Sequence, residues 1–161
     1  MTAKMDPAPY FCHLETPIGH LTIEAIEEGI TAIRWPDYSG SNIFRTSKLN
    51  QHLNQAIEQI TAYFDHKLDT FNLCLAPVGT QFQLRVWRAL QQIEFGTTVS
   101  YQYIAETIGN PNACRAVGSA NGKNPIPIII PCHRIISSDG TLGGFAAGLE
   151  TKRWLLEHEK R

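Results

Sequence analysis

The chain has 161 residues, of which 43% are hydrophobic and 18% are charged, and its formal net charge is −1. This is an ordinary globular composition, long enough for one large core or two small ones, and it excludes an intrinsically disordered chain. No apolar stretch approaches the roughly 20 residues that cross a bilayer, and residues 1–6 lack signal-peptide character, so a cytoplasmic protein without membrane contact is expected.

The segment between residues 10 and 35 predicts a β-meander. Turn-forming residues at 16–19 and 27–29 divide it into three short apolar runs. Side chains alternate in the second and third runs, so each of these strands is expected to have one buried face. The residues expected to share a face are Leu21, Ile23 and Ala25 in the second run and Ile30, Ala32 and Arg34 in the third.

An amphipathic helix is predicted after the meander and a loop at residues 36–47. Apolar side chains recur at helical spacing between Lys48 and about His66, so this helix is expected to cover the sheet. Residues 71–75 predict a further strand. The turn-forming run Pro77-Val78-Gly79-Thr80 then separates two domains.

The two predicted domains, residues 1–79 and residues 80–161, differ in charge. Residues 1–80 carry five Lys and Arg against nine Asp and Glu, a net charge of −4, whereas residues 81–161 carry nine against six, a net charge of +3. A modest positive excess is only a weak indication of a polyanionic partner, since most surface charges are simply solvated. The positive excess becomes informative because the same domain contains the Cys132 motif.

Three helices are predicted in the first half of the second domain. The second of them, from Tyr101 to Ile108, is closed by Gly109-Asn110-Pro111, and the third covers Ala113 to Asn121. Two short helices joined by such a turn resemble a helix-turn-helix, a generic motif that also occurs in helix pairs that only pack together. The residues that can cap the three helices are Thr80, Ser100 and Asn112.

The third helix has an unusually bare surface. Its residues are mostly Ala, Gly and Ser, and Arg115 is the long side chain that stands out. One interpretation is tight packing against another helix, with Arg115 in a surface ion pair. The other is a helix that enters a DNA groove and offers Arg115 as a wedge. Beyond the helix, Asn124 before Pro125 can bind neighbouring backbone groups and hold the turn.

Pro131-Cys132-His133-Arg134 is the most informative motif, because it follows the apolar run of residues 126–130 and so brings a thiol and an imidazole together out of a buried segment. The thiolate is the nucleophilic form of cysteine, and its population depends on a nearby proton acceptor or positive charge. His133 and Arg134 are both candidates for that role. The alternative is that Cys132 is a buried cysteine that behaves as a small hydrophobe, the commoner situation in a cytosolic chain.

The remaining cysteines and histidines predict neither a disulfide framework nor a metal site. Four cysteines are widely spaced in a chain too large to need disulfides, so free thiols are expected. His13, His20, His52 and His66 share the first half of the chain with two of the cysteines, but no Cys-x-x-Cys or His-x-x-x-His spacing occurs. No metal and no cofactor are therefore expected.

An ordered set of segments runs through the second domain: Ser100-Tyr101, Arg115-Ala116-Val117-Gly118, Asn124-Pro125, Ile130-Pro131-Cys132-His133-Arg134, Gly148-Leu149 and Trp154-Leu155-Leu156-x-x-Glu159. Together they resemble the O6-alkylguanine-DNA alkyltransferases, also called methylated-DNA–protein-cysteine methyltransferases. The resemblance spans most of residues 80–159, whereas residues 1–79 fit the family's variable amino-terminal domain in size and in their β-then-helix pattern. It implies an α/β protein of the constitutive bacterial type, with an RNase H-like amino-terminal domain and a helical carboxyl-terminal domain that contains a helix-turn-helix.

The resemblance also implies an activity. Such a protein repairs double-stranded DNA by irreversible, stoichiometric transfer of the methyl or other alkyl group from O6-methylguanine to its own cysteine, and O4-methylthymine is expected as a second substrate. It is expected to be a monomer in solution, to bind DNA through the minor groove and to flip the damaged nucleotide out of the helix. By resemblance the catalytic residues are Cys132 as the acceptor, His133 as the proton acceptor through a water, Glu159 as the residue that orients the imidazole, Asn124 as the support of the turn and Tyr101 as the general acid toward the base.

The DNA contacts and the base pocket follow from the same resemblance. Arg115 corresponds to a finger that fills the gap left in the base stack. Unstacking a base costs roughly a few kcal/mol, and a side chain that occupies the gap offsets part of that cost and so favours the flipped state. The expected DNA-contacting residues are Tyr101, Arg115, Ala116, Gly118, Ser119, Asn121 and Lys123. The expected base pocket consists of Tyr101, Cys132, Ile135, Phe145 and Ala146.

Two positions depart from the commonest family pattern: Cys114 in the recognition helix, where a small alanine is usual, and Ala147 beside the base pocket, where glycine is frequent. Three other functions are alternatives to alkyl transfer. A lesion sensor of the alkyltransferase-like kind would lack Cys132, and a papain-like hydrolase would have a distant histidine rather than the adjacent His133. A plain helix-turn-helix repressor would not explain the Pro-Cys-His-Arg segment.

Overall fold

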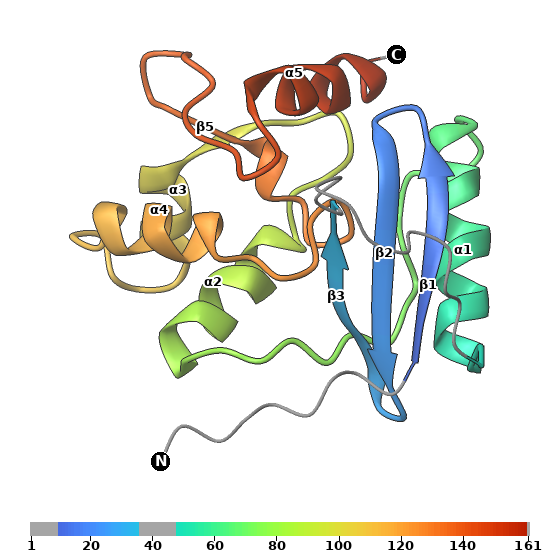
Figure 1. The fold of residues 1–161 in the computed structure, drawn as a ribbon. Coiled ribbons are helices and arrows are strands. Elements are labelled where there is room, and N and C mark those ends of the chain that lie inside the picture. The colour runs from blue at the N-terminus through green and yellow to red at the C-terminus, as the bar shows by residue number, and fades with distance from the viewer. Residues whose placement is uncertain (1–9, 36–47, 161) are drawn as a thin grey trace. The chain divides into compact units, whose positions relative to one another are not determined.

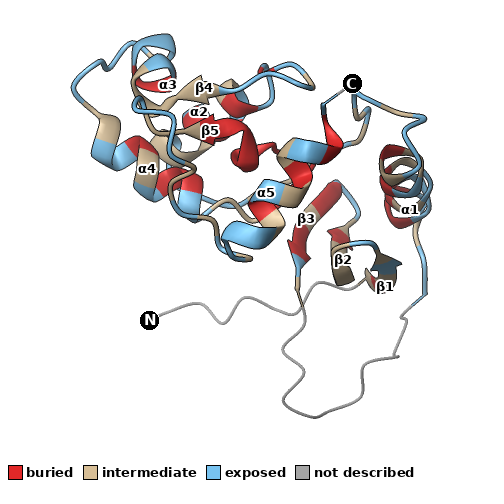
Figure 2. Cartoon of the chain, turned by 90° about the horizontal axis from the view of Figure 1, so that it is seen from above, coloured by how far each residue is buried: buried red, intermediate tan, exposed pale blue. Residues whose placement is uncertain are grey.

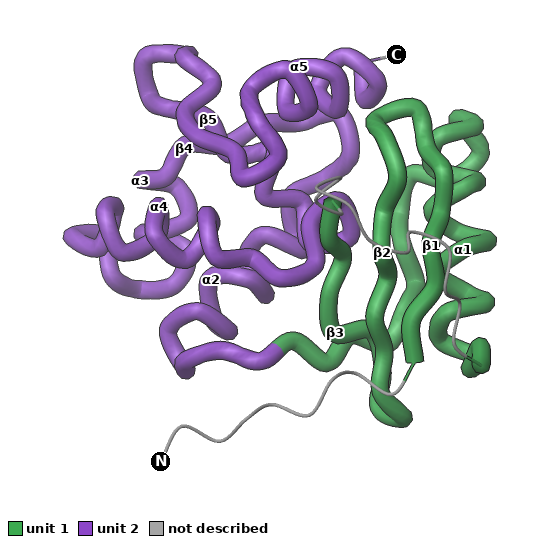
Figure 3. Tube along the Cα trace, viewed as in Figure 1, with its two compact units in different colours: residues 1–77 green, residues 78–161 purple. Residues whose placement is uncertain are grey.

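The computed structural model describes residues 10–35 and 48–160 (Figure 1). The chain divides into two compact units, residues 1–77 and residues 78–161 (Figure 3). The mixed α/β class predicted from the sequence is confirmed, with antiparallel strands in the first unit and mostly helices in the second. The loop predicted at residues 36–47 lies outside the described residues.

Three antiparallel strands form the sheet of the first unit. Their order in the sheet is the order of the chain, so the predicted β-meander is confirmed. In the second strand the predicted alternation is also confirmed, because Leu21, Ile23 and Ala25 are fully buried. The strands are β1 (Tyr10–Thr16), β2 (Gly19–Ile26) and β3 (Gly29–Arg34).

The predicted faces of β3 are wrong beyond its first residues. A register shift pairs Ile30 with Ala25 but Ile33 with Ile23, so β3 has one residue more than β2 over the same stretch. Such a β-bulge reverses which side chains reach each face of the sheet. Ile33, rather than Ala32, therefore shares the face of Ile23.

The strand predicted at residues 71–75 is reduced to a single bridge, in which Leu75 pairs in parallel with Ile30. Upstream of the bridge, the side chain of Gln59 accepts a hydrogen bond from the Asn72 N–H (2.8 Å) and donates one to the Asn72 carbonyl (3.0 Å). A helix side chain therefore satisfies the backbone groups that a strand would use.

Helix α1 (Gln51–Phe64) lies along one face of this sheet (Figure 1; Figure 2), and one side of the helix is buried. It begins later than predicted because Asn50 caps it, accepting a hydrogen bond from the Leu53 N–H (3.0 Å). The same Asn50 amide donates to the Ile26 carbonyl (3.2 Å) and ties the start of the helix to the end of β2. The prediction of a helix that covers the sheet is confirmed.

The second unit begins with three helices, α2 (Gln81–Leu90), α3 (Tyr101–Thr107) and α4 (Cys114–Gly122). Thr80 caps α2 and Ser100 caps α3, as predicted, and each side chain accepts a hydrogen bond from the third N–H of its helix. A turn joins α3 to α4, and the helix-turn-helix that the sequence indicates for this pair stays a prediction.

The start of α4 differs from the prediction. Its N-cap is Ala113, no side chain caps it, and the Ala113 N–H bonds to the Asn110 carbonyl (3.0 Å), so the predicted Asn112 cap is wrong. The body of α4 packs against α2, where the Trp87 indole donates to the Ala120 carbonyl (2.9 Å). Small side chains on α4 permit this close approach.

A short parallel ladder completes the second unit. The buried residues 126–130 lead into the 3-10 helix η1 (Cys132–Arg134), after which β5 (Ile135–Ile136) pairs with β4 (Val99–Ser100). This pairing places the start of α3 beside the end of η1. Residues 137–148, called the pocket loop below, then connect β5 to α5 (Leu149–His158). None of the helices in the described ranges has the length and apolar character that a membrane span requires.

Candidate active site

The thiol of Cys132 belongs to the first residue of η1, directly after the buried segment that the sequence indicates. Only 5% of Cys132 is exposed. Backbone bonds hold the turn on both sides, from the Cys132 N–H to the Ile130 carbonyl (2.7 Å) and from the Arg134 N–H to the Pro131 carbonyl (3.0 Å). The backbone that carries the sulfur is therefore firmly positioned.

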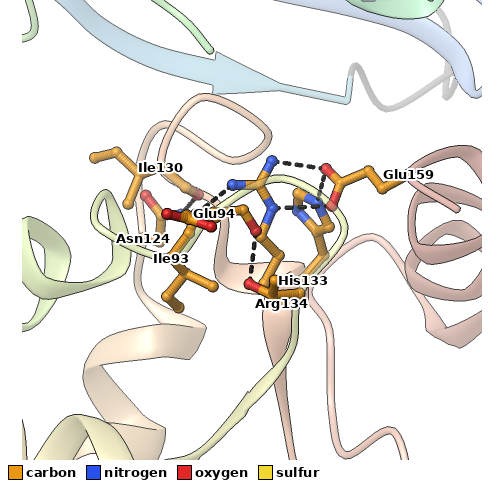
Figure 4. A network of polar contacts seen from close by, with 8 residues as sticks. Ile93, Glu94, Asn124, Ile130, His133, Arg134 and Glu159 are labelled. Atoms are coloured by element: carbon orange, nitrogen blue, oxygen red, sulfur yellow. Dashed lines mark hydrogen bonds and ion pairs between the residues drawn. The ribbon is translucent and has the colours of Figure 1, made fainter. Parts of the chain in front are cut away.

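The side-chain amide of Asn124 braces this turn (Figure 4). Its Nδ2 donates to the Ile130 carbonyl (2.8 Å), and its Oδ1 accepts from the Ile126 N–H (2.9 Å). A hydrogen bond from Asn124 also lowers the pKa of the Cys132 thiol. One amide thus fixes both ends of residues 126–130 and stabilises negative charge on the sulfur.

Glu159 joins His133 and Arg134 in a buried network (Figure 4). Its Oε1 accepts hydrogen bonds from His133 Nε2 (2.7 Å) and Arg134 Nη2 (2.9 Å), and its Oε2 accepts from Arg134 Nε (2.9 Å). Arg134 Nη1 donates to the Ile93 carbonyl (2.6 Å). The sequence offers Arg134 as a positive charge for Cys132, but the structure engages its guanidinium with Glu159 instead.

The bond to Glu159 fixes the tautomer of neutral His133. Because an ionised carboxylate can only accept, Nε2 of His133 carries the hydrogen and Nδ1 is left as an acceptor. Nδ1 is buried and has no hydrogen-bond partner among the described residues. An imidazole held in this way can take up a proton at Nδ1.

Burial and hydrogen bonding keep the two groups of this pair in different states. Burial lowers the pKa of His133, Glu159 opposes that effect, and the charges of Arg134 and Lys152 add to it. Burial by itself raises the pKa of Glu159, but hydrogen bonds from His133 and Arg134 hold that pKa far below the ordinary carboxyl value. At neutral pH the site therefore contains an ionised Glu159 and a neutral His133, which is available as a base.

The resting sulfur is protonated at neutral pH. Burial raises the pKa of the Cys132 thiol to about 11, while the Asn124 hydrogen bond and the charge of Lys152 act in the opposite direction. A nucleophilic thiolate therefore requires removal of the thiol proton, and His133 is the neighbouring base.

Lys152 belongs to the same site, although the sequence patterns did not single it out. It lies on α5, is fully buried, and its Nζ donates to the carbonyls of Ile135 (2.6 Å) and Leu142. The helical spacing of Lys152 from its neighbours indicates that its side chain points inward. Lys152, Leu155 and Glu159 are three and four residues apart and so share the inward face of this helix.

Tyr101 begins α3 and lies half-buried beside the pocket loop. A Cβ added to Gly143 would come within 2.9 Å of the Tyr101 hydroxyl, and one added to Gly118 would come within 3.7 Å of its ring. Gly143 also has a φ of +66°, so its backbone conformation and its neighbour both favour glycine. Burial, and then the negative charge of Cys132, raise the pKa of Tyr101, so its hydroxyl keeps a proton to donate.

The predicted DNA-contacting residues on the surface lie on or next to α4. Arg115, Ala116, Ser119 and Lys123 are exposed, and Gly118 faces the ring of Tyr101. Arg115 forms none of the ion pairs found in the described parts of the chain. The interpretation of Arg115 as one half of a surface ion pair is therefore not supported.

Asn121, expected at the DNA surface, lies in the interior instead. It is 6% exposed, its Nδ2 donates to the Cys132 carbonyl at 3.4 Å, and its Oδ1 has no partner among the described residues. Asn121 follows the buried Val117 by four residues and so shares its face of α4. Small residues occur on every side of α4, so the sequence shows no amphipathic pattern that would mark the buried face of this helix.

The residues of the predicted base pocket have different exposures. Ile135 is buried next to η1, whereas Phe145 is half-buried and Ala146 is exposed in the pocket loop. All four cysteines are free, as expected, and the half-buried Cys114 donates its thiol hydrogen to Gln102 Oε1 (2.8 Å). In the described ranges no three His, Cys, Asp or Glu side chains gather as a possible metal site.

Two family models cover most of the chain. Residues 81–161 match the model described as 6-O-methylguanine DNA methyltransferase, DNA binding domain. Residues 10–77 match the model described as 6-O-methylguanine DNA methyltransferase, ribonuclease-like domain, in agreement with the RNase H-like domain expected there.

Named relatives and solved structures extend these matches to almost the full length. A methylated-DNA–protein-cysteine methyltransferase of Methanosarcina barkeri is 43% identical over 155 residues, which are 94% of this chain and 97% of that protein. A protein of the same name from Mycolicibacterium paratuberculosis is 45% identical over 150 residues, 92% of this chain and 90% of the relative. The crystal structure of Mycobacterium tuberculosis OGT in complex with DNA superposes with a TM-score of 0.83 at 42% identity, covering 93% of this chain and 92% of that one.

Proposed function

Since this chain belongs to the family of 6-O-methylguanine DNA methyltransferases, we propose that Cys132 accepts, once and irreversibly, the alkyl group of an O6-alkylguanine in double-stranded DNA. The chain is a methylated-DNA–protein-cysteine methyltransferase, and its activity is DNA repair by alkyl transfer. The buried His133–Glu159 pair beside Cys132 is the observation that carries the assignment, because an adjacent oriented base is what activates a cysteine.

Activation of the thiol is the first step. The Cys132 proton moves through a bridging water to Nδ1 of His133, the free acceptor of that ring. Glu159 keeps the hydrogen on Nε2 and stabilises the imidazolium that forms. Arg134 holds Glu159 in its ionised form, and Asn124 stabilises the thiolate.

The thiolate then displaces guanine from the alkyl carbon. A bond forms between Sγ of Cys132 and that carbon, the bond from the carbon to O6 breaks, and its electron pair leaves with O6. Tyr101 donates a proton to the base, which leaves as neutral guanine, and the proton on His133 passes to solvent, from which Tyr101 is reprotonated. The balance is one alkyl group and one proton exchanged between sulfur and base, and the thioether product has no route back to the thiol.

We assign DNA binding to α3 and α4, from the minor-groove side, with the damaged nucleotide flipped into the pocket. The small exposed residues Ala116 and Ser119 permit close approach of α4, and Lys123 adds a positive charge at its end. Arg115 is long and exposed and can fill the gap in the base stack. O4-methylthymine is proposed as a second substrate, because it carries the same sp³ carbon on an exocyclic oxygen. Binding and transfer both belong to the domain of residues 80–161.

Mass spectrometry after reaction with a duplex that contains one O6-methylguanine tests this proposal. A gain of one methyl group, about 14 Da, confined to the Cys132 peptide and saturating at one per protein, is the expected covalent product. C132S should bind the same duplex without a gain in mass. C74S, which removes an exposed thiol in the first unit, should react like the wild type. Tight binding of the wild type without a gain in mass, or methylation of another cysteine, would contradict the assignment.

A further inference from the structure

Lys152 is a fully buried cation that has no part in the transfer steps described above. Its ammonium group donates two hydrogen bonds, to the Ile135 carbonyl (2.6 Å) and to the Leu142 carbonyl. An ammonium group taken out of water is costly unless hydrogen bonds and an opposite charge compensate it. The two carbonyls supply hydrogen-bond acceptors but no net charge.

The described residues provide no carboxylate partner for Lys152. Glu159, the buried carboxylate at the end of the same helix, forms its ion pairs with Arg134 and His133. Once Cys132 loses its proton, the charge of its thiolate raises the pKa of the Lys152 ammonium against the larger, lowering effect of burial. The effect is reciprocal, because the charge of Lys152 lowers the pKa of Cys132.

The two carbonyls that Lys152 binds belong to β5 and to the middle of the pocket loop. Ile135 directly follows η1, the turn that carries the thiol. Leu142 precedes Gly143, whose backbone lies against the Tyr101 hydroxyl. One ammonium group therefore connects the segment that holds the nucleophile to the segment that borders the proposed general acid.

We propose that Lys152 is a positioning residue of the transfer reaction, which holds the pocket loop onto β5 and is the counter-charge of the Cys132 thiolate. The inference rests on the proposed function in taking Cys132 as the alkyl acceptor. When sulfur bonds to the alkyl carbon, its negative charge leaves with O6 of guanine, and Lys152 keeps both carbonyl bonds but loses its counter-charge. The ammonium is therefore uncompensated beside the resting thiol and in the spent protein, and it is compensated only by the thiolate that reacts, so it favours formation of that thiolate.

The reaction of Cys132 with iodoacetamide tests this role without DNA or a base, since it also forms a bond between sulfur and an sp³ carbon. The wild type is compared with K152Q, which lacks the charge, and with K152R, which keeps it. Peptide mass spectrometry gives the rate at Cys132, and the rate at Cys114 in the same sample is the internal control. Tyr101, His133, Arg134 and Glu159 also face the site, so whole pH profiles are compared between variants.

K152Q should slow the modification of Cys132 at neutral pH by about tenfold, the change that one unit of thiol pKa produces, and should move the midpoint of the profile to higher pH. K152R should recover most of the rate, and Cys114 should be unaffected. A purely structural role would lower stability without moving the midpoint. Equal rates and equal midpoints in the wild type and K152Q would overturn the proposal.

A measurement on the Lys152 ammonium itself covers the case in which K152Q does not fold. The Nζ titration is followed by ¹⁵N NMR in C132S, whose serine stays neutral, and in C132D, whose carboxylate supplies a negative charge throughout that titration. The pKa of Lys152 should be higher in C132D than in C132S, and identical titrations would refute the counter-charge. Methyl transfer from duplex DNA is measured separately. If the wild type transfers no methyl group but the reactivity of Cys132 depends on Lys152, the proposed function is refuted and the role of Lys152 is retained. If the wild type transfers the methyl group but the reactivity of Cys132 does not depend on Lys152, the role of Lys152 is refuted and the proposed function is retained.

Discussion

Glu159→Gln preserves the size of a side chain that accepts three hydrogen bonds in the interior but removes its charge. A glutamine offers one acceptor oxygen and a nitrogen that only donates, so at least one donor of His133 or Arg134 would face another donor. The Arg134 side chain, 7% exposed, would also lose its counter-charge. Removing one partner of a buried pair costs about 3 to 5 kcal/mol, which for a chain of this size lowers the melting temperature by roughly 6 to 20 °C.

Urea unfolding at neutral pH, followed by circular dichroism, measures this loss for E159Q against the wild type. The matched control is E157Q, two residues earlier, because the exposed Glu157 pairs with the exposed Lys160 and surface pairs contribute little. E157Q should unfold like the wild type. If the unfolding free energy of E159Q lies within about 1 kcal/mol of the wild-type value, the buried network contributes no more than a surface pair and the reasoning is refuted.

The pH dependence of the same difference has a definite sign. The folded-state pKa of Glu159 lies far below its ordinary value of 4.5, so its contribution to stability is fully present above that value and is lost as the pH falls toward the folded-state pKa. The difference between the wild type and E159Q should therefore be constant from neutral pH down to about pH 5 and should shrink at lower pH. A difference that stays constant down to about pH 3 would show that the ionised carboxylate is not its source.

Three other outcomes are expected. Arg115→Ala should slow methyl transfer from duplex DNA more than reaction with free O6-benzylguanine, because only the duplex requires base extrusion; equal losses in single-turnover assays of both substrates would count against the finger role. Gly143→Ala should slow both reactions, because its Cβ would lie 2.9 Å from the Tyr101 hydroxyl at a φ that favours glycine; unchanged rates would place Tyr101 outside the reaction. Methylation of Cys132 should lower the melting temperature of the protein, since an added group in a tight site overpacks it by about 1 to 3 kcal/mol, and calorimetry that finds equal melting temperatures before and after reaction would contradict this.

Patterns that depend on neighbouring residues predicted the fold well. The alternation in β2 and the caps Thr80 and Ser100 are examples, and the structure confirms each of them. The faces of β3 were mispredicted because the apolar pattern does not mark the extra residue of a bulge. The strand predicted at residues 71–75 is largely absent because the side chain of Gln59, on α1, forms hydrogen bonds with the Asn72 N–H and carbonyl. A neighbouring strand would otherwise bond these groups.

At the candidate site the sequence indicates the central residues better than their surroundings. The Pro-Cys-His-Arg motif points to Cys132 and His133, the family resemblance adds Glu159, and His133 and Glu159 are in direct contact. The bond of Arg134 to the same carboxylate joins residues 25 positions apart, a distance at which no local pattern operates. Lys152 was missed because a lysine on an amphipathic helix is ordinarily solvated, and only its spacing from buried neighbours shows that it points inward.

Burial also protects the Cys132 thiol while the protein waits for damage. If Cys132 is the acceptor, as proposed, a protein consumed by one reaction has to keep this thiol intact from synthesis until it meets a lesion. Oxidants attack exposed thiolates in preference to buried thiols. The Cys132 sulfur is protonated and almost inaccessible, so it reacts slowly with oxidants on both counts. Cys74, which is exposed, lacks that shelter. Under the proposed function, this burial preserves the thiol rather than speeds its reaction. The number of unreacted molecules then sets how many lesions can be repaired before new synthesis.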